Sequence, residues 1–144
     1  MKRSAFAAAV LLLAASSSMA YGVVRSGQWT GMVMGTGASK LHGTATMKAG
    51  RDANTTEVTV SYAGDTPNTT RPWHVHVGSC TKAGGVLGGA KSYTPLLGDA
   101  KGAAESKVML PVALPDTGSY YVNIHESSTT MGTIVACGDL KHDK

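Results

Sequence analysis

The sequence predicts one all-β domain, a sandwich or closed barrel of seven or eight strands. Short runs rich in Val, Thr, Tyr and Ile are separated by clusters of Gly, Pro, Asn and Asp, which is typical of strands joined by turns. No segment has a convincing helical period. The chain has 144 residues, the size of one ordinary domain, and contains no internal repeat or linker.

The individual strands are predicted from the alternation of apolar and polar residues between turn signals. They are Gln28–Met34, Lys40–Lys48, Glu57–Tyr62, Pro72–Val77, Ser106–Val112, Ser119–His125 and Gly132–Gly138. In the third strand the apolar residues Val58, Val60 and Tyr62 alternate with polar ones, which indicates one buried face. The Gly-rich stretch 81–102 is the main irregular element, and loops of this length are usually functional or mobile.

Residues 1–20 are expected to be a secretory signal peptide. Lys2 and Arg3 precede an apolar run from Ala5 to Ala15, which is too short to span a bilayer. Ser18-Met19-Ala20 then supplies the small residues that a signal peptidase requires. We therefore expect cleavage after Ala20 and a periplasmic or secreted domain over 21–144.

Export determines how the 2 cysteines are interpreted. An oxidising compartment favours a disulfide between Cys80 and Cys137, whereas a cytosolic location would favour thiol or metal roles. Two buried free thiols remain the alternative.

Charge and motifs exclude several function classes. The net charge of +4 is spread along the chain, and the one clustered basic pair lies at the N-terminus, so nucleic-acid binding is not expected. There is no second apolar stretch of membrane-spanning length, no Gly-x-Ser-x-Gly and no phosphate-binding loop.

The chemistry concentrates in Trp73-His74-Val75-His76-Val77. On a strand, His74 and His76 point to the same face about 6.6 Å apart, and the apolar residues between them point to the other. The same parity in 121–125 places His125 on the face opposite Val122 and Ile124. Three imidazoles can hold copper or zinc, and three His ligands leave a coordination position open on copper. Exposed polar residues that bind nothing would explain a His-x-His pair about as well.

These residues also carry a family resemblance. The quoted stretches are Trp73-His74-Val75-His76, Cys80-Thr81-Lys82-Ala83-Gly84, Asp99-Ala100-Lys101-Gly102, Val122-Asn123-Ile124-His125-Glu126 and Ala136-Cys137-Gly138. In order and character they resemble the copper/zinc superoxide dismutase family, over roughly the last half of the chain. The resemblance implies a Greek-key β-barrel, one copper ion held by His74, His76 and His125, and a Cys80–Cys137 bridge that ties a loop to the barrel.

The departures from the family pattern concern its zinc site and its substrate guidance. Val86 stands where the family places the histidine that bridges copper and zinc, and Ile134 stands where it places the substrate-guiding arginine. The family's charged loop is also largely missing between His125 and Cys137. A zinc site is therefore not expected, and copper binding is favoured over efficient dismutation.

A second resemblance is to chordin-type (CHRD) domains, a β-rich family. It is carried by Gly118-Ser119-Tyr120-Tyr121-Val122-Asn123-Ile124-His125, by Gly132-Thr133-Ile134 and by the upstream His-x-His. The two cysteines favour the dismutase-like interpretation.

Five further side chains are weaker candidates. His42 and His142 are expected to be solvent-exposed, and Met32 and Met34 are expected to fill gaps in the core. Met131 lies in the short segment before Cys137 and is the candidate accessory metal ligand, although packing on the barrel end is the favoured role.

Two functions follow from these residues. The first is an exported copper-binding protein that stores, buffers or transfers copper, with a copper-transfer partner. The second is a copper-only superoxide dismutase that converts superoxide to oxygen and hydrogen peroxide. A structural domain that binds no metal is the third alternative.

Overall fold

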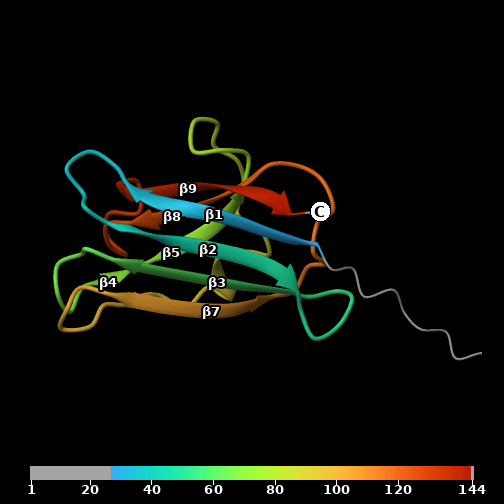
Figure 1. The fold of residues 1–144 in the computed structure, drawn as a ribbon, viewed down its shortest axis with the longest axis horizontal. Helices are drawn as coiled ribbons and strands as arrows, with labels where there is room; N and C mark the ends of the chain where they lie inside the picture. Colours follow the sequence, from blue (N-terminus) through green and yellow to red (C-terminus); the bar gives the residue numbers. More distant parts are fainter. Residues whose placement is uncertain (1–26, 144) are drawn as a thin grey trace, which may run out of the picture.

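A curled, antiparallel seven-stranded sheet dominates the computed structural model, which describes residues 27–143. The strands are β1 (Gln28–Gly35), β2 (His42–Ala49), β3 (Thr56–Ala63), β5 (Trp73–Val77), β7 (Ala104–Leu110), β8 (Tyr120–His125) and β9 (Ile134–Asp143), and β4 (Thr70–Arg71) pairs with β6 (Leu96–Leu97) in a separate ribbon. The spatial order is β5-β8-β9-β1-β2-β3-β7, and Figure 1 shows the sheet curled into a half-barrel. The all-β prediction is confirmed.

The chain crosses repeatedly between the two edges of this sheet. It passes from β3 to the far edge strand β5, back to the other edge strand β7, and again across to β8. Every pair in the large sheet is antiparallel. The seven expected strands are present within a few residues. β9 runs further than predicted, to Asp143, because its last residues pair with the start of β1. The expected signal peptide lies outside the described residues.

The hydrophobic core lies on the concave face of the curl. Alternate residues of each strand enter it, among them Val33, Val58, Val60, Val75, Val122 and Ile124, all of which are fully buried. Within residues 27–143 no helix has the length and apolarity that a membrane crossing requires.

The stretch 81–102 packs into the opening between β5 and β7. Leu96 is fully buried there, and Leu87 and Tyr93 pack against the core. The carbonyl of Thr94 accepts a hydrogen bond from the Trp73 indole of β5 at 2.8 Å and another from the Ser106 hydroxyl of β7 at 3.1 Å. This one residue therefore links the two edges of the sheet.

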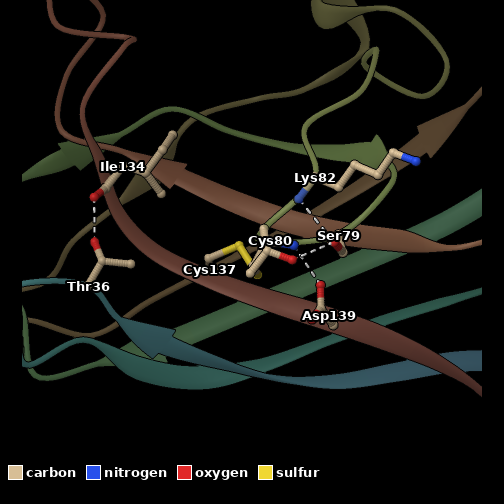
Figure 2. Close-up of a disulfide and its surroundings, with 8 residues drawn as sticks. Thr36, Ser79, Cys80, Lys82, Ile134, Cys137 and Asp139 are labelled. Atoms are coloured by element: carbon tan, nitrogen blue, oxygen red, sulfur yellow. Dashed lines mark hydrogen bonds between the residues drawn. A yellow bond between two sulfur atoms is a disulfide. The ribbon is translucent and has the colours of Figure 1, made fainter.

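The predicted disulfide is present and joins the loop after β5 to β9. Figure 2 shows Cys80 bonded to Cys137, with the Asp139 carboxylate accepting the Cys80 amide at 2.7 Å. Because the bridge closes a loop with a sequence separation of 57, chain entropy gives a stabilisation on the order of 4 kcal/mol. A disulfide is compatible with an oxidising compartment.

The prediction that Met32 and Met34 fill the core is wrong. Their side chains are 63% and 52% exposed, and the intervening Val33 is fully buried. The sequence predicts that residues of β1 alternate between two faces, but it does not show which face is buried, because valine and methionine are both apolar.

The buried residue Leu96 of β6 provides a test of how the half-barrel is closed. Leu96→Ala should lower the free energy of unfolding by about 2–5 kcal/mol, because it removes a side chain that fills the opening. The neighbouring Leu97 is 70% exposed, so Leu97→Ala should change the free energy of unfolding by no more than about 0.5 kcal/mol. Urea denaturation measures both, and equal effects would contradict this packing.

Candidate metal centre

Three histidines from two adjacent strands meet on the convex face of the sheet. His74 and His76 lie on β5, and His125 ends β8 beside it. Each ring offers one nitrogen, and these three atoms lie within 4.8 Å of one another. The group could hold a metal ion.

The alternation of β5 produces this arrangement, as the sequence predicts. Trp73 and Val75 are 1% and 0% exposed on the core side, so His74 and His76 must point outward. His125 is fixed separately, because its amide donates to the Pro72 carbonyl at 2.8 Å. A bulge between Ile124 and His125 ends the regular pairing with β9 at this point.

Main-chain carbonyls hold two of the rings and determine their tautomers. His76 Nδ1 lies 3.0 Å from the Gly84 carbonyl, and His125 Nδ1 lies 2.6 Å from the Met131 carbonyl. A carbonyl can only accept, so each Nδ1 carries the proton and each Nε2 keeps its lone pair. Such outer hydrogen bonds orient histidines that ligate metals.

The remaining nitrogen atoms face one another at close range. His74 Nδ1 is 3.1 Å from His125 Nε2, close to the spacing of about 3.3 Å between two ligands that each lie about 2.0 Å from one ion. His76 Nε2 is buried and has no hydrogen-bond partner within residues 27–143. A buried polar atom without a partner is costly, and a metal ion would satisfy this one.

Burial keeps two of these imidazoles in the form that binds metals. It lowers the pKa of His74 to about 4, with the neighbouring His125 and His76 contributing in the same direction. It also lowers the pKa of His125, although the hydrogen bond to the Met131 carbonyl acts in the opposite direction. Both rings are therefore neutral at pH 7.

Aromatic side chains that the sequence analysis did not single out support the rings. Tyr93 packs edge-on against His74 with ring centroids 5.1 Å apart, and Tyr121 stacks on His76 at 5.1 Å. Tyr121 could have been found from its parity with His125 on β8. Tyr93 could not, because its position depends on the path of the long loop.

A buried ion pair anchors the loop that follows His125. Arg71 donates to both carboxylate oxygens of Asp65, at 2.8 and 2.7 Å, and also to the Glu126 carbonyl at 2.6 Å. The Arg71 and Asp65 side chains are only 14% and 5% exposed. Sequence reasoning missed this pair, because no local pattern connects the two residues to His125.

The two positions that depart from the dismutase pattern lie directly beside the histidines. Val86 forms an isolated bridge with His76, and Ile134 pairs with His125. Both side chains are hydrocarbons and cannot ligate a metal or carry a charge.

The other candidate residues lie outside the cluster. His42 is exposed, as expected, and its Nδ1 lies 3.0 Å from the Lys40 carbonyl. His142 differs from expectation, because it is partly buried and its ring packs 4.8 Å from that of Trp29. Met131 approaches the cluster through its carbonyl, and its side chain is 37% exposed.

Comparison with known proteins gives no family for this chain. No protein-family model matches the sequence, and no curated protein matches it.

The Asp65–Arg71 pair should make stability pH-dependent. Burial alone would raise the pKa of Asp65, but the hydrogen bonds from Arg71 and Thr69 outweigh it and lower the pKa from 3.8 to about 2. The stabilisation, about 2 kcal/mol, is therefore present above about pH 4 and is lost as the pH falls through about 2. Urea denaturation should show that Asp65→Asn is less stable than the unmodified chain at neutral pH and that the gap narrows between these pH values.

Glu105→Gln, which removes an exposed carboxylate on β7, is the matched control and should leave the pH dependence unchanged. A gap between Asp65→Asn and the unmodified chain that is constant down to pH 2 would contradict this assignment.

Proposed function

We propose that this chain is an exported, superoxide dismutase-like protein that binds one copper ion for storage, buffering or transfer. His74, His76 and His125 are the proposed ligands, through Nδ1 of the first and Nε2 of the other two. The observation that carries the proposal is His76 Nε2, which is buried, has no hydrogen-bond partner in the described part of the chain and faces two further imidazoles.

The donor set favours copper over zinc. At a given nitrogen site divalent copper binds more tightly than zinc, and three imidazoles are an ordinary copper environment. A structural zinc site needs four protein ligands, and the position from which a fourth histidine would come is occupied by Val86.

The surroundings of the cluster favour holding copper over turning over superoxide. An anionic substrate reacts fast when fixed positive charge guides it to the metal. Ile134 supplies no such charge beside His125, and Arg71 is neutralised by Asp65. The segment 126–133 carries a single charged side chain, Glu126, which repels an anion.

Met131 is the proposed accessory ligand. Its backbone already holds His125, so a small rearrangement of the same loop would bring the thioether toward the ion. Thioether sulfur prefers Cu(I), which suits a site that transfers copper.

A superoxide dismutase without zinc is the second candidate function. It is favoured by the all-nitrogen donor set, which leaves a coordination position open for substrate. This activity would require that neither a bridging imidazole nor a guiding cation is needed.

Copper binding can be tested with two substitutions of the same kind. His76→Phe keeps a ring stacked on Tyr121 but removes one ligand, so copper affinity should fall by more than the 10–100-fold that losing an outer hydrogen bond costs. His142→Phe keeps the contact with Trp29 and should still bind one divalent copper ion per chain. Equilibrium dialysis against a competing chelator measures the copper affinity of both variants. The proposal is contradicted if the unmodified chain and His142→Phe both fail to bind copper tightly.

The dismutation rate of the copper-loaded chain separates the two functions. For a storage or transfer protein we expect a rate far below the diffusion limit, because neither Ile134 nor the paired Arg71 offers a positive charge that would guide the anion. A rate near the diffusion limit of about 10⁹ M⁻¹s⁻¹ that disappears in His125→Ala would instead establish the enzyme.

A further inference from the structure

Two methionines on the convex face of β1 have no structural role in the core. Met32 and Met34 are 63% and 52% exposed, although β1 lies near the centre of the sheet with β9 and β2 on either side. Outward-facing neighbours on β1 and β2 are polar, as Thr30, Thr44 and Thr46 show, and on β9 the partner of Met34 is the disulfide residue Cys137. Exposed thioethers at two successive outward positions are therefore not explained by packing.

The register places a histidine directly beside this pair. His42, the first residue of β2, pairs with Met34, and Met32 pairs with Thr44. The His42 ring is exposed, and its Nδ1 lies 3.0 Å from the Lys40 carbonyl. Because that carbonyl can only accept, Nδ1 carries the proton and Nε2 keeps a free lone pair.

General strand geometry allows this group to share one ion. Met32 and Met34 are two residues apart on one face, a spacing of about 6.6 Å, and cross-strand neighbours such as Met34 and His42 have Cβ atoms about 5 Å apart. Methionine has three rotatable side-chain bonds, so both sulfur atoms can converge. Two thioethers are soft donors that select Cu(I) over hard divalent cations, and an imidazole is also a suitable ligand for copper.

We propose that Met32, Met34 and His42 form a second metal site, specific for a soft monovalent cation such as Cu(I). The three residues are called the thioether site below. It lies outside the three-histidine cluster and does not depend on copper binding there.

The thioether site and the histidine cluster share one face of the sheet. Met34 pairs with Cys137, Cys137 with Asn123, and Asn123 with His74. Three steps between strands of about 4.8 Å give roughly 14 Å along the sheet. Met32 and Asp139 line one surface depression, and Asp139 pairs with Tyr121, which pairs with His76. The thioether site and the histidine cluster therefore lie on one face of the sheet, with the Cys80–Cys137 bridge between them.

Silver(I), which is soft, monovalent and redox-inactive, is the probe for this site. In the full chain carrying His76→Phe, silver should shift the methyl resonances of Met32 and Met34 and leave that of Met109 unchanged. The double variant Met32→Leu with Met34→Leu should bind silver at least tenfold more weakly, and His42→Ala should weaken it less. Met109→Leu, at a methionine 37% exposed on β7, should have no effect.

The outcomes distinguish a built site from general thioether chemistry. Equal losses of silver binding in Met109→Leu and in the double variant would overturn the proposal, and so would the absence of methyl shifts at Met32 and Met34. Leucine is close to methionine in volume, and both positions are exposed, so the double variant should unfold at the same temperature as the unmodified chain. If it does not, the methyl shifts of the chain with intact methionines decide the question alone. All of these results are independent of whether the histidine cluster binds copper.

Discussion

The burial of Trp73 and Val75 is the constraint on which the metal centre depends. In a strand, moving the pairing by one residue exchanges the two faces. The packing that keeps Trp73 and Val75 in the core therefore also fixes the direction of His74 and His76. The indole of Trp73 adds a directional restraint, because it must reach the Thr94 carbonyl. The ligands are therefore positioned by the hydrophobic side of the strand that carries them.

Backbone carbonyl groups in two loops orient the histidine rings that the strands position. The carbonyls of Gly84 and Met131 select the proton position on His76 and His125. At position 84 a Cβ would clash with the Val77 carbonyl, so the close approach of this loop requires glycine. Each carbonyl lies in a loop that is fastened nearby. The first loop is attached by the disulfide at Cys80, and the second by the hydrogen bond from Arg71 to Glu126. The cluster is preorganised because its loops are held independently of any metal.

Much of the fold and of the cluster could be predicted from the sequence, because both depend on strand alternation. The period of two identified the strands, and it placed three histidines on outward faces before any strand pairing was known. Alternation failed at β1, where Met32, Val33 and Met34 are all apolar and polarity gives no phase. It also gave no information about Tyr93, Gly84 or Arg71, which reach the cluster through loops whose paths depend on long-range contacts. The residues that tune a site were harder to predict than the residues that form it.

The bridge across the open side of the half-barrel has an evolutionary consequence. Thr94 joins β5 to β7 through its main-chain oxygen, which receives both the Trp73 indole and the Ser106 hydroxyl. Every amino acid supplies that oxygen, so selection acts more strongly on the two donors than on position 94, whose own hydroxyl adds one further hydrogen bond to Ser106 at 3.1 Å. Descendants of this chain can therefore diverge at position 94 while an indole at 73 and a hydroxyl at 106 are retained. A residue that is central to the architecture would then look unimportant in a comparison of sequences.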